Sequence, residues 1–198
     1  RWYAGAGFDV VSTANNHAWS FSVTGYWPKK LVNYLDVSNV QQVTVEAYPW
    51  PVIRLGDLYL LYAEALNEAN GPGAETLKWI NLVRERAGLK SVEESWSQYS
   101  KQPAAYQNQA GLRKIIHQER LIEMAFEGQR FWDLRRWKEA QQTLSQPVQG
   151  WNYTGKDEEN YYQVRVLFNP SFKRRDYLWP IKESEIIVNN NLLQNPDW

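Results

Sequence analysis

One stretch of this sequence decides the fold: residues 119–137 read Glu-Arg-Leu-Ile-Glu-Met-Ala-Phe-Glu-Gly-Gln-Arg-Phe-Trp-Asp-Leu-Arg-Arg-Trp. Gly128 divides it into two segments of helical character. If each residue advances by about 100°, the helical step, the apolar side chains before the glycine share one face with Glu119 in its middle. These apolar residues are Leu112, Ile115, Ile122 and Phe126. The pattern therefore predicts a helix that carries a carboxylate inside its buried stripe.

A carboxylate in an apolar stripe must be paired, because burying an isolated charge is too costly. Four arginines lie in the same stretch, namely Arg120, Arg130, Arg135 and Arg136. We expect Glu119 to be largely buried and paired with at least one of them, in a network that joins two helices.

A helix pair is predicted upstream, over residues 53–70 and 74–87, with Gly71-Pro72-Gly73 as the break. The first helix is expected to point one apolar stripe inward, formed by Leu55, Leu58, Tyr59, Tyr62, Ala65 and Leu66. The pair spans about 35 residues, and Leu55-Gly56-Asp57-Leu58-Tyr59 matches a tetratricopeptide pattern. One such pair cannot bury its own faces, so it needs packed neighbours.

The rest of the chain is predicted to contain loops, short strands and further helices. Residues 91–110 are expected to be a surface loop with one helical turn, and helices are predicted over 111–127, 129–144 and 182–188. Strands are predicted over 10–13, 21–26 and 162–168, with 176–179 pairing back onto the last. We expect a mainly α protein in four sections: 1–52 loop and short strands, 53–90 helix pair, 111–144 helix pair, and 145–198 loop, hairpin and tail.

Composition excludes several function classes. The 22 basic and 22 acidic residues balance at a pI near 7.0, which argues against nucleic-acid binding and against a polybasic membrane patch. Cysteine is absent, so a thiolate metal site or a cysteine nucleophile is excluded. No apolar run approaches the ~18 residues that a membrane span needs. We expect no cofactor.

The motifs together resemble the C-terminal part of the SusD/RagB family, over residues 24–198 in the family's order. The signature residues that carry the resemblance are Arg54, Glu64, Glu119, Arg120, Glu123, Glu127, Gly128, Arg130, Asp133 and Arg136. Matching stretches also occur at Thr24-Gly25-Tyr26, Trp50–Leu55 and Tyr177-Leu178-Trp179-Pro180-Ile181.

The resemblance implies a glycan-binding lipoprotein of the outer-membrane nutrient-uptake systems of Gram-negative bacteria. Its partners would be an oligosaccharide or polysaccharide and a SusC-like TonB-dependent transporter. Its place would be the cell surface, and its only membrane attachment would be a lipid anchor outside this segment. Because the family carries that anchor and further helical repeats ahead of this region, we expect the chain to be the C-terminal part of a longer precursor.

Glutamate, aspartate and histidine residues are the candidates for a catalytic or metal-binding role, and their patterns favour neither. Glu119 and Glu123 lie one helical turn apart, which would suit acid–base cleavage of a glycosidic bond. Nearby arginines favour a structural role instead and are expected to lower the carboxylate pKa values. His17 and His117 stand in no ligand motif, and Asp157, Glu158 and Glu159 lack the spacing of an EF-hand, so a solvated charge run is favoured over calcium.

Aromatic residues are the best candidates for ligand binding, since the chain has 11 tryptophans and 12 tyrosines. A sugar ring stacks its apolar face on a flat aromatic ring, while planar polar side chains bind its hydroxyls. The first candidate set is Trp2, Tyr3, Asn16 and Trp19, and the second is Trp151 and Tyr153.

We therefore expect non-covalent glycan capture without catalysis. Two rival functions stay open. A tetratricopeptide-type scaffold would bind protein or peptide on a concave helix face. A glycoside hydrolase would present a carboxylate pair to a cleft and release sugar products.

Overall fold

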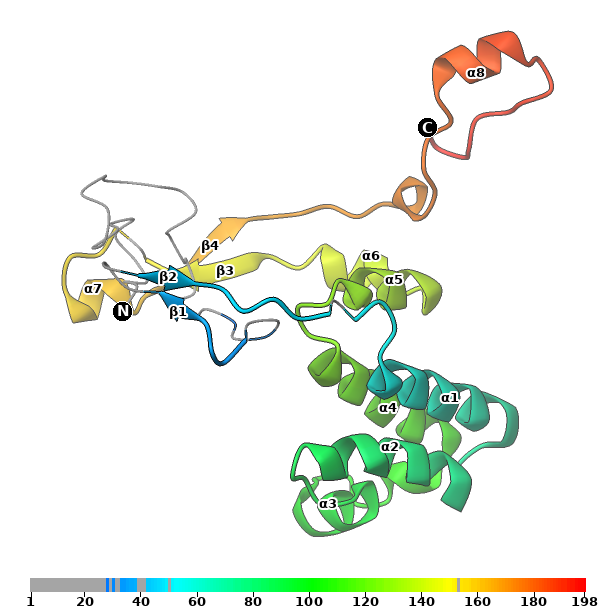
Figure 1. The fold of residues 1–198 in the computed structure, drawn as a ribbon. Coiled ribbons are helices and arrows are strands. Elements are labelled where there is room, and N and C mark those ends of the chain that lie inside the picture. The colour runs from blue at the N-terminus through cyan, green and yellow to red at the C-terminus, as the bar shows by residue number, and fades with distance from the viewer. Residues whose placement is uncertain (1–27, 29, 31–32, 39–41, 50, 153) are drawn as a thin grey trace. The chain divides into compact units, whose positions relative to one another are not determined.

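The computed structural model describes residues 28, 30, 33–38, 42–49, 51–152 and 154–198. These residues divide into two compact units. Ala47–Arg130 form the first, and Phe131–Trp198 with the described part of the first 46 residues form the second. The expected mainly α fold is confirmed (Figure 1). None of the described helices combines the length and apolar character of a membrane span.

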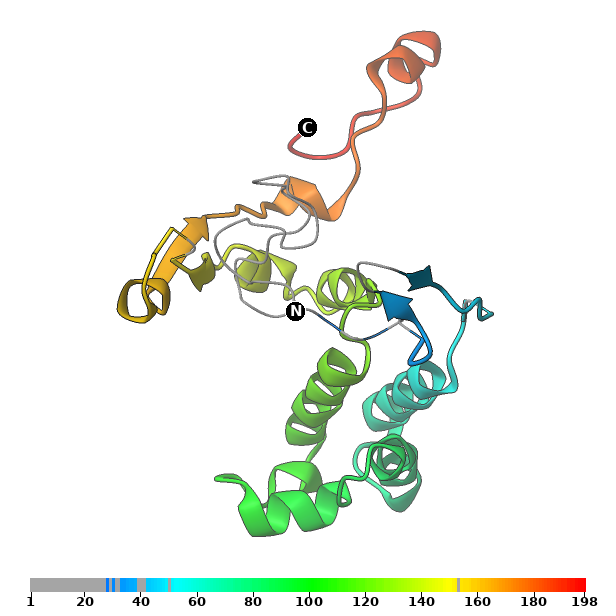
Figure 2. The same cartoon turned by 60° about the vertical axis from the view of Figure 1, so that its left-hand side comes forward.

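The first unit is helical and begins with the expected pair. Helix α1 (Leu55–Asn70) ends at Gly71, whose φ of 78° lies in the left-handed region that glycine adopts without strain. Helix α2 (Ala74–Arg86) turns back and packs along α1, as Figures 1 and 2 show. The helix pair is therefore confirmed, with bounds within two residues of those expected.

Two further helices complete this unit. The segment expected to be mostly loop holds α3 (Val92–Tyr99), where the Ser91 side chain accepts a hydrogen bond from the Glu94 N–H at 3.1 Å. A 3-10 turn, η2 (Ala105–Gln107), leads into α4 (Gln109–Glu123). Asn108 caps α4 by accepting from the Gly111 N–H at 2.8 Å. Such caps satisfy N–H groups that the first turn leaves without partners, so both helices start where the sequence places a capping side chain.

The core of the first unit lies between α1, α2, α3 and α4. Its buried side chains are Leu60, Ala63, Ile80, Val83, Val92, Leu112, Ile115 and Ile116. The stripe expected to face inward on α1 is wrong in part, because Leu58 and Tyr62 are exposed while Leu60 and Ala63 are fully buried. Helix α1 is apolar around much of its circumference, and Ala63 gives the face on which another helix can approach closely.

The second unit begins within the helix that follows Gly128. The long helix expected over 129–144 is wrong. The chain forms α5 (Gln129–Arg136) and α6 (Ala140–Leu144), separated at Lys138, whose φ is 62°. A non-glycine residue with positive φ cannot continue a right-handed helix, so the break lies there. Leu134, Ala140 and Phe172 form a small core beside this break.

A β-hairpin follows. Strand β3 (Val148–Trp151) pairs antiparallel with β4 (Val164–Phe168), with Trp151 opposite Val164. A one-turn helix, α7 (Glu158–Tyr161), lies in the connection. The strand predicted over 162–168 is confirmed as β4. Its expected pairing with 176–179 is wrong, because η3 (Arg174–Tyr177) is a 3-10 turn and β4 pairs instead with β3, in a segment expected to be loop.

The tail and a second hairpin complete the described chain. Helix α8 (Glu183–Val188) agrees with the expected short helix. Strands β1 (Val37–Ser38) and β2 (Val43–Thr44) pair antiparallel. The strands expected over 10–13 and 21–26 lie outside the described residues.

Candidate functional site

Glu119 is 5% exposed, so the expected burial is confirmed. Its expected partner is wrong. The guanidinium of Arg84, on α2, donates to the Glu119 carboxylate. Arg84 also donates to the Lys90 carbonyl at 2.7 Å and to the Ser95 hydroxyl at 2.8 Å, which fixes its position. The arginines after Gly128 belong to a separate helix, so a residue distant in sequence but close in the fold takes their place.

Burial raises the pKa of the Glu119 carboxyl, and the charge and hydrogen bond of Arg84 oppose that rise. The expectation that neighbouring arginines would lower this pKa is therefore wrong, because desolvation outweighs them. A raised pKa suits an acid catalyst, but a catalyst must also reach its substrate. Since Glu119 is buried inside the helical unit and bound by Arg84, the geometry favours a structural role.

Glu123 and Glu127 form a second ion-pair cluster around Arg54, which lies just before α1. Arg54 donates from Nη1 to Glu123 at 2.8 Å and from Nε to Glu127 at 2.8 Å. Arg86 binds Glu123 as well, at 2.7 Å. Arg54 thus meets two signature residues about 70 positions later in the sequence, and these ion pairs tie the end of α4 to the start of α1. Both carboxylates of the suspected acid–base pair, Glu119 and Glu123, are occupied by arginine.

The other signature residues are also placed in the structure. Arg120 is 2% exposed and binds Asp57 at 2.8 Å. Asp133 is buried and accepts from Arg136 at 2.9 Å. Gly128 has a φ of 79°, which explains glycine at the hinge between α4 and α5. Glu64 is buried on α1, and Arg130 is half-buried.

The aromatic candidates divide into two groups. Trp2, Tyr3, Asn16 and Trp19 lie outside the described residues, as does Tyr153. Trp151 is half-buried at the end of β3. Its ring meets that of Tyr162, with centroids 5.5 Å apart and planes at 85°. The structure therefore brings Trp151 together with an aromatic residue that sequence reasoning missed. The sequence did hold a signal for this contact. In the strand predicted over 162–168, Tyr162 and Val164 share one face, and Val164 lies opposite Trp151 in the hairpin.

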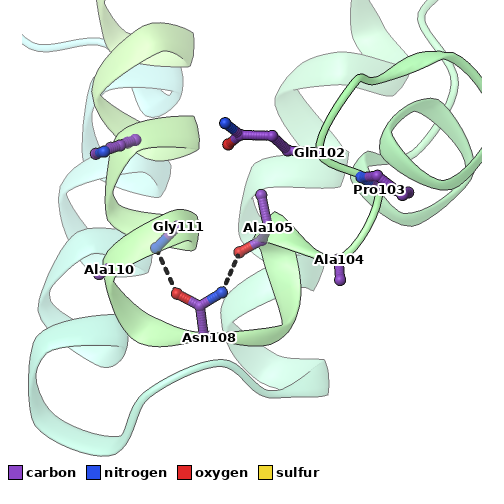
Figure 3. Close-up of a pocket in the computed structure, with 8 residues that line it drawn as sticks. Gln102, Pro103, Ala104, Ala105, Asn108, Ala110 and Gly111 are labelled. Carbon is purple, nitrogen blue, oxygen red and sulfur yellow. Dashed lines mark hydrogen bonds between the residues drawn. The ribbon is translucent and has the colours of Figure 1, made fainter.

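A pocket of about 410 Å³ lies between η2 and the first turns of α4 (Figure 3). Its lining residues are Gln102, Pro103, Ala104, Ala105, Asn108, Ala110, Gly111 and Lys114. The lining includes no aromatic ring, and Asn108 is committed to the cap of α4. Gly111 packs so closely on the Ala105 carbonyl that a Cβ would lie 2.1 Å from its oxygen, which explains glycine at this position. This pocket lacks the flat ring that favours a sugar.

Metal ligands do not cluster in the part of the chain that the structure describes, where no group of three or more suitable side chains comes together. Asp157, from the acidic triplet, caps α7 and accepts from the Asn160 N–H at 2.9 Å. That hydrogen bond lowers the pKa of the Asp157 carboxyl. The carboxylate therefore has a structural task at the start of a helical turn.

Arg84 and Arg86 are further residues that the sequence did not single out, and Arg135 has another role than the pairing with Glu119 that was expected. Arg135 donates to the backbone carbonyls of Asp176 and Tyr177 and so holds η3 against α5. The signal for Arg84 was its place beside Val83 on the buried face of α2. A charge there needs a buried partner, and Glu119 is that partner.

Comparisons with known proteins agree on one family. The sequence model of the SusD family matches residues 5–198. SusD-like protein P2 of Formosa agariphila is 35% identical over 143 residues, which is 72% of this chain and 24% of that protein. SusD-like protein P25 of the same organism is 43% identical over 86 residues, or 43% of this chain and 15% of that protein. The chain thus spans about a quarter or less of the length of these curated relatives.

Solved structures give the same result. A SusD-like carbohydrate-binding protein from Bacteroides fragilis superposes with a TM-score of 0.62 at 27% identity, covering 96% of this chain and 38% of that one. Another SusD-like protein of B. fragilis has a TM-score of 0.60 at 29% identity, covering 76% of this chain and 28% of that one. The match over nearly the whole chain, together with the ion-pair network that joins the signature residues, shows that this chain belongs to the SusD family.

Proposed function

We propose that this protein captures glycan non-covalently at the bacterial cell surface and delivers it to a SusC-like TonB-dependent transporter of the outer membrane. One observation carries the proposal: the chain belongs to the SusD family, and a solved SusD-like relative at 27% identity is a carbohydrate-binding protein. The ligand would be an oligosaccharide or a segment of polysaccharide. A lipid anchor outside this segment would hold the protein at the outer membrane.

The binding chemistry follows from the sugar ring. One face of the ring presents C–H groups and stacks on an aromatic side chain, while its hydroxyl rim needs planar hydrogen-bonding groups. Trp2, Tyr3 and Trp19 are proposed as the stacking residues of the first site, and Asn16 as its hydrogen-bonding residue. Trp151 and Tyr153 form the second.

Capture without cleavage is part of the proposal. A glycosidase needs two carboxyl groups that flank the scissile bond, one to protonate the leaving group. The pair on α4 that sequence spacing suggested, Glu119 and Glu123, is bound by Arg84, Arg54 and Arg86. These contacts support a structural role for the pair and therefore a binding protein rather than a hydrolase.

A protein-binding scaffold is the second candidate, and one observation favours it. Helix α1 exposes Leu58 and Tyr62, which are 46% and 49% exposed, on a helix pair of tetratricopeptide type. Exposed apolar side chains on one helix face suit an apolar peptide helix. This candidate predicts peptide binding and no retention by polysaccharide.

Affinity gel electrophoresis tests the proposal. The purified full-length protein is run through native gels that each contain one candidate polysaccharide. It should migrate more slowly in the gel that contains its ligand than in a gel without polysaccharide, while bovine serum albumin should be unaffected. Trp19→Ala should weaken retention, since losing a stacking hot spot costs roughly 1–3 kcal/mol, about tenfold or more in affinity. Circular dichroism serves as the folding control. Unchanged retention of a folded variant would remove Trp19 from the site, and no retention in any polysaccharide would contradict glycan capture.

A further inference from the structure

The connection between β3 and β4 is closed by its own hydrogen bonds. The Asn152 backbone N–H donates to the carbonyls of Tyr161 and Gln163, at 3.1 and 2.9 Å. The Asn152 side-chain amide donates to the Asn160 carbonyl at 2.9 Å. Gly155 packs so tightly against this segment that a Cβ there would lie 2.6 Å from the carbonyl carbon of Asn160. The segment after α7 is therefore held in one position on the hairpin.

Tyr162 is the aromatic residue that this frame presents. Its ring lies 5.5 Å from Trp151 at 85° and 5.1 Å from Tyr161 at 88°, so two neighbouring rings meet it edge to face. Even so, Tyr162 is 58% exposed. Trp151 is half-buried and supports Tyr162 more than it faces solvent. A ring fixed by neighbours and still open on its surface loses little entropy when a flat ligand stacks on it.

Polar groups flank this ring. Tyr162 donates its backbone N–H to the Glu158 carbonyl at 3.1 Å, so the two residues are one helical turn apart and share a side of that turn. Glu158 and Glu159 are both exposed. Carboxylate oxygens accept hydrogen bonds from sugar hydroxyls, and charged acceptors make the stronger bonds.

The charge of this loop restricts the ligand. Residues 154–162 contain three acidic side chains, Asp157, Glu158 and Glu159, against the single base Lys156. A sugar that carries a carboxylate or sulfate would meet like charge beside the ring, and that repulsion is unfavourable. An uncharged sugar with free hydroxyls meets no such penalty.

We propose that Tyr162, supported by Trp151 and flanked by Glu158 and Glu159, is a stacking platform for an uncharged sugar ring. This rests on the proposed glycan-binding function and adds to it a residue and a ligand class. It also assigns Trp151 a supporting role, edge to face with the ring that makes the contact.

Calorimetric titration of the full-length protein tests the platform with maltoheptaose, cellohexaose, laminarihexaose and xylohexaose as neutral probes and oligogalacturonate as the anionic probe. For the neutral probe that binds best, Tyr162→Ala should weaken affinity about tenfold or more, and Tyr162→Phe should keep most of it. Tyr99→Ala is the matched control, because Tyr99 is 71% exposed on α3 and lies outside the platform. It should bind like wild type.

Nitration of tyrosine by tetranitromethane, read by peptide mass spectrometry on the wild type, needs no variant to fold. A saturating neutral oligosaccharide should protect Tyr162 and leave Tyr99 reactive. Unchanged affinity of folded Tyr162→Ala, full nitration of Tyr162 in the saturated complex, or preference for oligogalacturonate would each overturn this proposal alone. If the wild type binds no glycan at all, the proposed function falls together with it.

Discussion

Arg84→Met should lower the free energy of unfolding by about 3–5 kcal/mol at pH 7, the usual cost of leaving one member of a buried ion pair without its partner. The methionine fills much of the space of the arginine but leaves the 5%-exposed Glu119 without a counter-charge. It also removes the donors to the Lys90 carbonyl and the Ser95 hydroxyl. Chemical denaturation followed by circular dichroism measures the loss.

Arg86→Met is the matched control. Arg86 lies on the same helix, two residues later, and also binds a glutamate, but its side chain is 62% exposed. Exposed ion pairs are worth about 0–1 kcal/mol, so this variant should stay close to wild type. Equal losses in the two variants would show that burial does not set the strength of the Arg84–Glu119 pair.

The stability of Arg84→Met should also depend on pH in a distinctive way. Without Arg84, nothing opposes the rise that burial produces in the pKa of Glu119, so the folded state binds that proton more tightly than the unfolded chain. Stability then increases as the pH falls from the raised folded pKa toward the unfolded value of about 4.3. The deficit of Arg84→Met relative to wild type should therefore shrink between neutral pH and about pH 4.5. A deficit that is constant over this range would contradict the unpaired buried carboxylate.

Leu60→Ala should cost about 2–5 kcal/mol, because Leu60 is fully buried at the centre of the first unit and its truncation leaves a cavity. Leu58→Ala gives the comparison on the same helix. Leu58 is 46% exposed, so its change should stay within about 0.5–1 kcal/mol. Thermal or chemical denaturation of both variants measures the difference. A larger loss at Leu58 would show that the sequence-based stripe, with Leu58 inward, is the correct face of α1.

The α1–α2 pair was predictable because its signals are local. Gly71 marks the end of α1 through its own backbone conformation. The capping side chains Ser91 and Asn108 are also local signals, although the sequence analysis expected loop where Ser91 starts α3. The break at Lys138 was not predictable, since nothing in that residue type requires a positive φ. The inward face of α1 was also ambiguous, because leucines on both sides of the helix satisfy helical periodicity equally.

Contacts between residues that are distant in sequence could not be predicted either. Burial of Glu119 followed from its place among apolar residues, whereas the identity of Arg84 depends on how α2 packs, 35 residues away. The raised pKa of the Glu119 carboxyl likewise depends on how completely the fold excludes water. The residues that neighbour Glu119 in the sequence do not reveal this. In the hairpin, the register that places Trp151 opposite Val164 also depends on a partner segment that local sequence does not identify.

The exposure of the candidate binding residues was the least predictable property. Aromatic abundance identified Trp151, but stacking needs an open ring, and openness depends on packing. Trp151 is half-buried, while Tyr162, from the same cluster, keeps most of its surface free. Residue type alone therefore identified Trp151 as a candidate, whereas the difference in exposure between Trp151 and Tyr162 becomes visible only in the folded structure.

Glycan capture without cleavage is tested most directly by one calorimetric titration of the full-length protein with the best-retained oligosaccharide, followed by a reducing-end assay on the same sample after prolonged incubation. A mixture without protein is the control for spontaneous hydrolysis. We expect saturable binding and no increase in reducing ends over that control. Release of reducing ends would contradict it and support a hydrolase, and the absence of binding heat with every neutral oligosaccharide would contradict glycan capture itself.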